Sequence, residues 1–266
     1  MISKCLTDST LELIKSYIGK DCISQPYLYA NLYQYGICDD DVHCWALTDS
    51  NKMKGVFLQY YDCLHFYSRD IENYVDEVAA FIRKMNTKII MIPESVGRII
   101  EMQPQYKLEQ NHVVTFSNSI TINSNGPQLS LATVEDIQEI VEMTIQDPIF
   151  HDVYTREVLE KQLRKRIEHA LGRVFCIRLN GQIVAKEETY AENSDMAIVS
   201  GLLVHPKYRG NGFAPFLISH IAQLLKNEGK MPISFIRNDN IPSIRAHEKI
   251  GCSFGNVLYK YIRADF

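Results

Sequence analysis

Hydrophobic residues in the second half of the chain recur with two periods. Short apolar runs bounded by turn residues indicate strands, whereas apolar residues three to four positions apart indicate amphipathic helices. The strands that we expect lie at residues 128–132, 173–179, 182–190, 197–204, 231–235 and 256–262, and the helices lie at 134–145, at 156–171, and from 212 and 241 onward. Asn180-Gly181, between two of these strands, is a typical hairpin turn. This order of elements predicts a mixed α/β domain.

The first half shows a weaker version of the same order. The helices that we expect there lie at residues 11–18, 27–32, 71–83 and 96–102, and the strands lie at 44–47, 54–61, 63–67, 88–92 and 113–116. Residues 117–127 are polar and rich in turn residues, which is typical of a linker. We therefore predict two domains, 1–116 and 128–266, joined by that linker.

A turn with two glycines joins the strand at 197–204 to the helix that follows. At the start of a helix, unpaired backbone N–H groups and the positive end of the helix dipole face outward, and glycine lets an anion approach them closely. Arg209 adds a permanent positive charge. We therefore predict that the turn binds phosphate, with a simple helix-entry turn as the alternative. Its residues are Arg209, Gly210, Asn211, Gly212, Phe213 and Ala214.

The pattern Arg-x-x-Gly-x-Ala at Arg209, Gly212 and Ala214 resembles the pyrophosphate-binding motif of the GCN5-related N-acetyltransferase (GNAT) family. The resemblance implies that acetyl-CoA (coenzyme A) is the cofactor. It also implies that a backbone N–H near Leu202, Leu203 and Val204 polarises the thioester carbonyl and that this strand binds the pantetheine amides. A P-loop does not fit, because it requires Lys followed by Ser or Thr after its last glycine.

A second segment, residues 240–251, is similar to the last helix of that family, where Asn, a small residue and Tyr occur at i, i+3 and i+7 before a glycine. This chain has Asn240, Ser243 and His247 at those positions. Spacings of three and four place them on one helical face. The resemblance implies that this face lines the pantetheine arm and presents an acid to the CoA sulfur.

The resemblance further implies the α/β (α+β) class, with a mixed, mostly antiparallel acetyltransferase sheet flanked by helices and present twice. Residues 1–116 would be a degenerate acetyltransferase-like copy. No glycine occurs between Phe66 and the helix expected next, so that copy has no phosphate-binding turn. An unrelated α/β lobe is the alternative.

Acyl transfer to an amine requires the neutral amine, and a lysine-like amine with a pKa near ~10.4 is only about one part in 10³ neutral at pH 7. Glu187, Glu188 and Asp195 are the candidate bases. Glu187 and Glu188 are neighbours on one strand and point to opposite faces, so at most one reaches the pocket directly. Either carboxylate could instead be solvated or paired with Lys186.

His247 stands where the family usually has the tyrosine that protonates the departing thiolate. A histidine with a pKa of ~6.5 is about one quarter protonated at pH 7, which predicts a rate that falls in the neutral range if His247 is the acid. A surface or capping histidine without a catalytic role is the alternative.

These residues together predict an acyl-CoA-dependent N-acyltransferase, transferring acetyl to a primary amine by direct attack on the thioester. The alternatives are a CoA-binding protein without turnover and a regulatory dimer whose N-terminal half is the functional part. The acceptor, a small-molecule or peptide amine, is expected to contact the variable residues 149–156 and the N-terminal domain. Ten of the fifteen tyrosines lie in the first half. Ordinary half-buried packing explains these tyrosines; the alternative is a role in acceptor selection or in a homodimer contact, for which residues 27–35 are the candidates.

Composition excludes several other classes. Hydrophobic residues make up 46% and charged residues 23%, which is typical of a folded protein. The net charge of −4 and the lack of a strongly basic region argue against a nucleic-acid partner, and no apolar run is long enough to cross a membrane. Seven cysteines without a C-x-x-C pair indicate reduced thiols, and we expect a cytoplasmic protein without a metal site.

Overall fold

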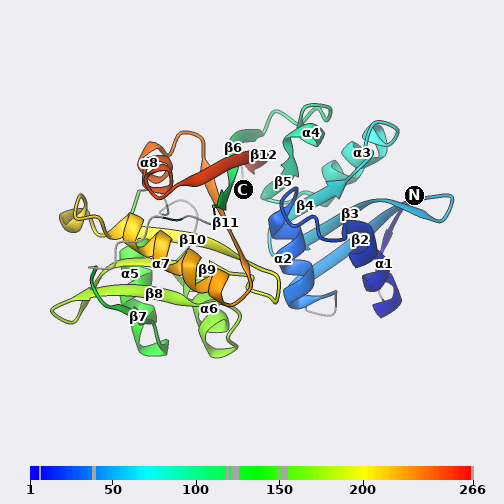
Figure 1. Cartoon of the computed structure of the whole chain (residues 1–266). Helices are drawn as coiled ribbons and strands as arrows, with labels where there is room; N and C mark the ends of the chain where they lie inside the picture. The colour runs from blue at the N-terminus through cyan, green and yellow to red at the C-terminus, as the bar shows by residue number, and fades with distance from the viewer. Residues whose placement is uncertain are drawn as a thin grey trace. The chain divides into compact units, whose positions relative to one another are not determined.

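The structure is a computed structural model that describes residues 1–5, 7–37, 40–117, 120, 126–148, 150 and 155–264 (Figure 1). The chain divides into two compact units. Unit 1 contains Met1–Val114, Phe235–Asn240 and Phe254–Phe266, and unit 2 contains Thr115–Ser234 and Ile241–Ser253. The units therefore differ from the predicted ranges 1–116 and 128–266, because two late segments of the chain belong to unit 1. Most of the predicted linker lies outside the described residues.

The same order of helices and strands occurs twice along the chain. The first series is β1 (Ile2–Lys4), α1 (Asp8–Ile18), α2 (Pro26–Tyr35), β2 (Val42–Asp49), β3 (Lys52–Tyr60), β4 (Cys63–Ser68), α3 (Val75–Met85), β5 (Ile89–Pro93), α4 (Glu94–Gly97) and β6 (Tyr106–Phe116). The second series is β7 (Leu129–Leu131), α5 (Ile137–Ile145), α6 (Arg156–Glu168), β8 (Val174–Leu179), β9 (Gln182–Tyr190), β10 (Met196–Val204), α7 (Phe213–Asn227), β11 (Met231–Arg237), α8 (Ile241–Lys249) and β12 (Cys252–Arg263).

Each unit contains a mixed sheet that is mostly antiparallel. In unit 1 the strands run in the order β1-β2-β3-β4-β5-β12, and only β4 and β5 are parallel. In unit 2 the order is β7-β8-β9-β10-β11, and only β10 and β11 are parallel. A helix, α3 or α7, makes the crossover between the two parallel strands, as parallel pairing requires. The predicted fold class is confirmed.

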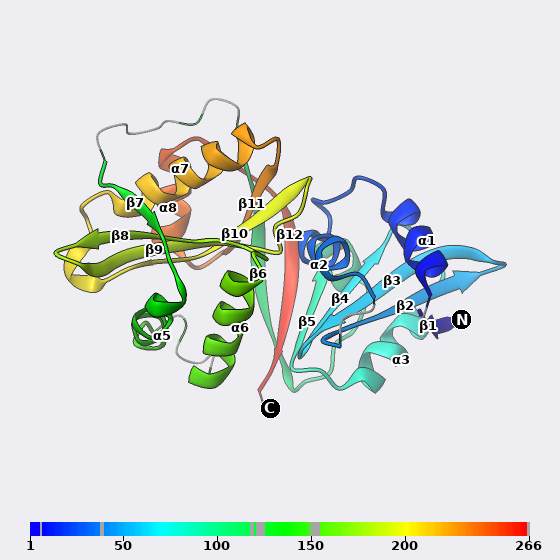
Figure 2. The same ribbon diagram turned by 90° about the horizontal axis from the view of Figure 1, so that it is seen from below.

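Helices cover both faces of the sheet in unit 2 (Figure 2). Because side chains alternate along a strand, Phe175, Ala197 and Val199 pack against α7, whereas Val174 and Cys176 pack against α5 and α6. This alternation places Glu187 and Glu188 on opposite faces, as the sequence predicted.

Three sequence expectations for unit 1 differ from the structure. The helix expected at 96–102 is a single turn, Glu94–Gly97, and the strand expected at 113–116 extends over Tyr106–Phe116. Its first half is polar and does not show the apolar run by which the strand was recognised. The short edge strand Ile2–Lys4 was not expected and pairs with β2.

Candidate cofactor site

The glycine turn lies at the start of α7 with both glycines in the left-handed region. Gly210 has φ 84° and Gly212, the N-cap of α7, has φ 79°. A Cβ atom built at either position would meet nothing within 4 Å, so both backbones face open space. The first N–H groups of a helix have no carbonyl earlier in the helix to bind. The turn therefore offers backbone donors to an anion and leaves room for it, and this space fits a pyrophosphate.

Arg209 is held at the base of this turn by two contacts. Its Nη2 donates to Oδ2 of Asp147 at 2.9 Å, and its Nε donates to the carbonyl oxygen of Val204 at 3.1 Å. Its side chain is half-exposed, whereas that of Asp147 is 5% exposed. Nothing in the sequence pattern pointed to Asp147, because it lies 62 positions from Arg209.

The end of β10 separates from β11 but remains paired with β9. Its parallel register with β11 ends at Val199 and Ser234. Its antiparallel register with β9 shifts between Ser200 and Leu203, where Gly201 has φ 65°, and it resumes at Leu203 and Val204. The bulge thus includes Leu202, one of the three residues predicted to contact the thioester and the pantetheine arm. A lone glycine inside a predicted strand is a signal for a bulge, and the sequence analysis did not use it.

Glu188 lies directly beneath the bulge and is paired with two cations. Its carboxylate contacts Nζ of Lys186 at 2.5 Å and the guanidinium of Arg166; Lys186 and Glu188 are buried, and Arg166 is partly buried. Burial and, to a lesser extent, the charge of Arg166 lower the pKa of Lys186 to about 7. A Cβ at Gly201 would lie 2.5 Å from Oε1 of Glu188. Pairing with Lys186 was one of the alternatives left open, and a carboxylate held by two cations is a weak base.

Glu187 points to the α7 face and is 1% exposed. Burial raises its pKa well above the usual value, against the opposing charge of Lys186. Its Oε2 has no hydrogen-bond partner among the residues that the structure describes. Its charge also contributes, after burial, to raising the pKa of the Cys252 thiol to about 12. A raised pKa makes the ionised form of Glu187 a stronger base than an ordinary carboxylate.

His247 is 3% exposed in α8, and its ring protonation follows from one contact. Nδ1 lies 2.8 Å from the carbonyl oxygen of Ser243, so Nδ1 carries the proton and donates it. Nε2 is then a bare acceptor with no partner in the described part of the chain. Burial lowers the pKa of His247 to about 4. The fall in rate expected in the neutral range therefore has no basis in His247, which is neutral there.

The two other residues of segment 240–251 that were predicted to contact the cofactor belong to different units. Ser243 lies half-buried in α8, whereas Asn240 precedes the helix and belongs to unit 1. The N–H of Asn240 donates to the carbonyl oxygen of Arg237. Of the acceptor-contacting residues expected at 149–156, Ile149 and 151–154 lie outside the described residues.

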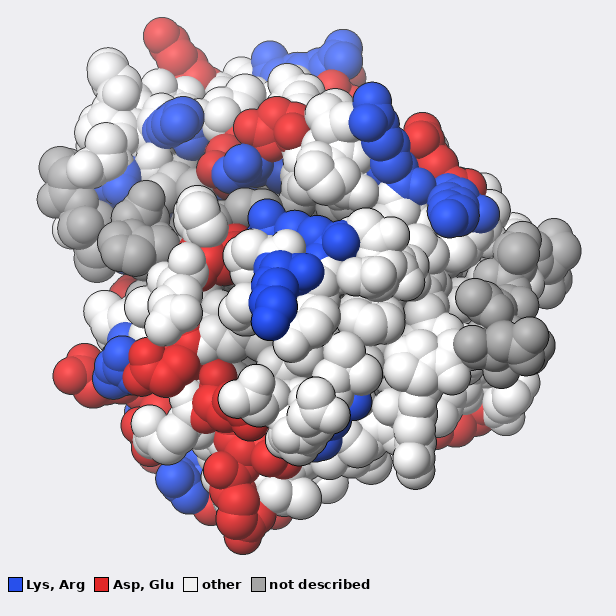
Figure 3. Space-filling model, turned by 90° about the vertical axis from the view of Figure 1, so that its left-hand side faces the viewer, with Lys and Arg blue, Asp and Glu red and all other residues white. Residues whose placement is uncertain are grey.

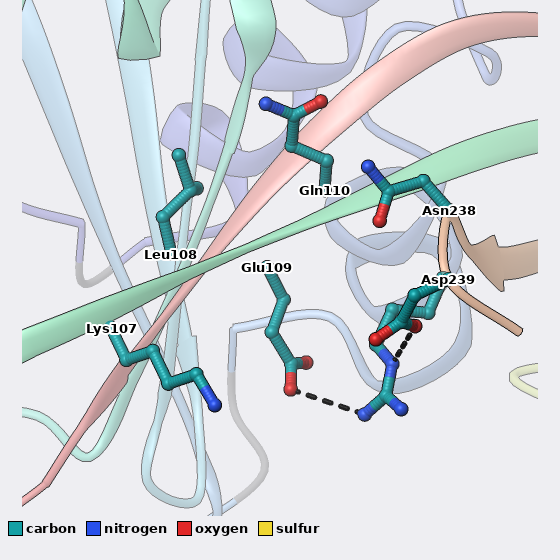
Figure 4. Close-up of a pocket in the computed structure, with 7 residues that line it drawn as sticks. Lys107, Leu108, Glu109, Gln110, Asn238 and Asp239 are labelled. Atoms are coloured by element: carbon teal, nitrogen blue, oxygen red, sulfur yellow. Dashed lines mark hydrogen bonds and ion pairs between the residues drawn. The ribbon is translucent and has the colours of Figure 1, made fainter.

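A hollow of about 280 Å³ lies in unit 1 along β6 and the segment after β11 (Figure 4). Its central Arg237 pairs with Glu109 at 3.3 Å and with Asp239, and Glu109 also contacts Lys260 at 3.4 Å. These charges neutralise one another, so the hollow is a polar surface groove without an evident ligand.

Further features of the described residues bear on the kind of site. On the face drawn in Figure 3, Lys and Arg lie in separate groups. No cluster of three metal-ligating side chains occurs in the described ranges. None of the described helices is long and apolar enough to cross a membrane. Six cysteines are free, and Cys38 lies outside the described residues.

Residues 137–252, which include the glycine turn, the bulge and α8, match the model of the acetyltransferase (GNAT) family. This part of the chain belongs to the GNAT family. The chain is 29% identical over 108 residues to a histidine N-acetyltransferase of Oreochromis niloticus and 28% identical over 109 residues to that of Scomber australasicus. Each match covers 40% of this chain, but only 30% and 31% of the two relatives.

Solved structures resemble the whole chain. A GNAT-family acetyltransferase from Colwellia psychrerythraea has a TM-score of 0.67 at 14% identity, covering 98% of this chain and 99% of that one. A GCN5-related N-acetyltransferase from Sphaerobacter thermophilus has a TM-score of 0.64 at 10% identity, covering 98% and 94%. A tandem GNAT protein from the clavulanic acid biosynthesis pathway has a TM-score of 0.59 at 10% identity, covering 98% and 97%. At these identities the likeness shows the fold, and it extends over both units.

Proposed function

We propose that this chain is an acetyl-CoA-dependent N-acetyltransferase in which an amine attacks the bound thioester directly. The observation that carries the proposal is the turn at Gly210 and Gly212, whose left-handed backbone faces open space at the start of α7. In the same unit, β10 continues beyond its last pair with β11, and this edge of the strand suits a ligand that continues from the pyrophosphate.

The described residues suggest a role for each part of the reaction. The N–H groups at the start of α7 would bind the pyrophosphate, and an N–H in 202–204 would polarise the thioester carbonyl. Glu187, in its ionised form, would take the proton of the attacking amine, because a raised pKa makes that carboxylate a stronger base. Glu188 would hold the bulge from beneath and take no proton, because Lys186 and Arg166 already pair with it.

The acceptor class is a primary amine, and histidine is the first acceptor to test. Two curated relatives, each of which matches 40% of this chain, are histidine N-acetyltransferases. Small amines and peptide amines are the other acceptors for the same assay, in which release of the free CoA thiol is measured.

Calorimetric titration with acetyl-CoA tests the cofactor site. Wild type is expected to show saturable binding that Gly212→Glu abolishes, because the added carboxylate would lie where the anion binds. Gly181→Glu is the matched control. Gly181 has φ 83°, close to the 79° of Gly212, and also faces open space, but it lies in the β8–β9 hairpin. Equal binding by wild type and Gly212→Glu would refute the site.

A CoA-binding protein without turnover is the second candidate, and two contacts favour it. The neutral ring of His247 donates its one N–H to the carbonyl oxygen of Ser243, and the charge of Glu188 is neutralised by its partners. Binding of acetyl-CoA without thiol release from any amine, together with unchanged binding in Glu187→Gln, would favour this candidate over the enzyme.

A further inference from the structure

Asp147 is a buried carboxylate that the proposed reaction does not use. It follows the C-terminus of α5, where its N–H donates to the carbonyl oxygen of Thr144 at 3.2 Å and its own carbonyl accepts from the N–H of Phe150 at 3.0 Å. Its side chain is 5% exposed and accepts from Nη2 of Arg209 at 2.9 Å. The backbone around Asp147 is thus held by two hydrogen bonds, and its carboxylate contacts Arg209 of the glycine turn.

The contact with Asp147 determines which way the Arg209 guanidinium can point. Nε is already used by the carbonyl oxygen of Val204, the last residue of β10, at 3.1 Å. With Nε and Nη2 both engaged, the planar guanidinium is fixed at two positions, and its remaining N–H groups keep one orientation. Arg209 therefore connects the end of α5 and the end of β10 to the turn at Gly210–Gly212.

We propose that Asp147 is a positioning residue for the cofactor turn, acting through Arg209 to hold the turn in the shape that receives the pyrophosphate. This inference rests on the proposed function, because it concerns the same cofactor. It identifies a residue 62 positions away from the turn in sequence as a determinant of cofactor affinity.

Charge alone predicts the opposite result, which makes the proposal easy to test. CoA carries several negative charges, so removing a nearby carboxylate would strengthen its binding if Coulomb repulsion were the main effect of Asp147. If Asp147 positions Arg209, its removal weakens binding, because the guanidinium and the turn lose their fixed geometry. The two effects differ in sign.

The experiment is a calorimetric titration of the full chain with acetyl-CoA. Asp147→Ala is expected to weaken binding by roughly tenfold, in the range found for coupled charged pairs. Asp147→Asn keeps an acceptor oxygen at the same position and is expected to recover most of the affinity. Glu142→Gln is the matched control, because Glu142 is a carboxylate within α5 that is paired with an arginine, Arg156, outside the turn. This variant should bind as wild type does. Unfolding temperatures establish that each variant is folded.

Arg209→Ala and the double variant Asp147→Ala/Arg209→Ala complete the test. If Asp147 acts through Arg209, the double variant binds no more weakly than Arg209→Ala. Equal or tighter binding by Asp147→Ala, or fully additive losses, would overturn the positioning role and leave the proposed function standing. Failure of the wild type to bind acetyl-CoA would overturn both.

Discussion

Among the described strands, units 1 and 2 each contain one pair of parallel strands that separate before their ends. The two openings differ in the side chains that enter them. In unit 2 the register of β10 and β11 ends at Val199 and Ser234, and in unit 1 that of β4 and β5 ends at His65 and Met91. In unit 1 the side chain of Gln25 enters this opening. Its Nε2 donates to the carbonyl oxygens of Met91 at 2.8 Å and of Phe66 at 3.4 Å.

The helices that follow these strands begin differently as well. The first turn of α7 contains no acidic residue and follows two glycines with positive φ. That of α3 contains Asp76 and Glu77, and its N-cap is Tyr74 with φ −130°. Carboxylates at a helix N-terminus occupy the position that favours an anionic ligand and repel it. The strand framework alone does not make a cofactor site; the helix start and the contents of the opening decide it.

The largest effect that we expect is a loss of stability when the ion pairs of Glu188, beneath the end of β10 in unit 2, are broken. Glu188→Gln leaves Lys186 and Arg166 buried without their anion, and loss of one partner from a buried ionic group costs about 3–5 kcal/mol. The neighbouring Glu187→Gln is the control. Burial already holds the Glu187 carboxyl toward its neutral form, so its amide is expected to cost less than ~1 kcal/mol. Urea unfolding measures both, and equal losses would show that the pairing of Glu188 does not support unit 2.

A smaller effect, about 2 kcal/mol for each histidine concerned, is expected on acidification, and each unit contributes one such histidine. Burial lowers the pKa of His65 in unit 1 to about 3 and that of His247 in unit 2 to about 4, against ~6.5 in an unfolded chain. The stability that each neutral ring contributes is fully present above pH 6.5 and is lost as the pH falls toward the folded pKa. Each histidine thus loses roughly 2 kcal/mol between pH 7 and pH 5.

His247→Phe should therefore be less sensitive to acid than wild type, when the free energy of unfolding is compared at pH 7 and pH 5. His169→Gln, which removes an exposed histidine at the C-cap of α6, serves as the control. An identical acid sensitivity in His247→Phe and wild type would mean that folding does not lower the pKa of His247.

Features set by neighbouring residues were predictable from the sequence. The glycine turn, the hairpin at Asn180-Gly181 and the opposite faces of Glu187 and Glu188 follow from local backbone preference and strand alternation. Contacts between distant residues were not predictable in the same way. Asp147 meets Arg209, and Gln25 meets Met91, only because the fold brings them together. Position in the sequence also does not show how deeply a side chain is buried. Burial lowers the pKa of His247, and its ring donates its proton to the carbonyl oxygen of Ser243.

The smallest loss of stability is expected from substitution of Gln25. This substitution tests whether the Gln25 side chain closes the opening in unit 1. Gln25→Leu leaves the carbonyl oxygens of Phe66 and Met91 without this donor and is expected to cost about 1 kcal/mol, the usual net value of a hydrogen bond. Gln59→Leu is the matched control, because Gln59 also donates from Nε2 to a backbone carbonyl, that of Tyr61, outside the opening.

Gln25→Gly removes the side chain altogether. It therefore tests the contents of the opening separately from the residues at the start of the helix. We expect acetyl-CoA to bind this variant with the affinity and the single-site stoichiometry of wild type, because the start of α3 still has no glycine turn and still contains Asp76 and Glu77. Calorimetry measures the number of sites directly. A second binding event in Gln25→Gly that persists when Gly212→Glu is added to it would mean that the glutamine alone prevents binding in unit 1. The glycine turn would then be less decisive than the comparison of α3 with α7 indicates.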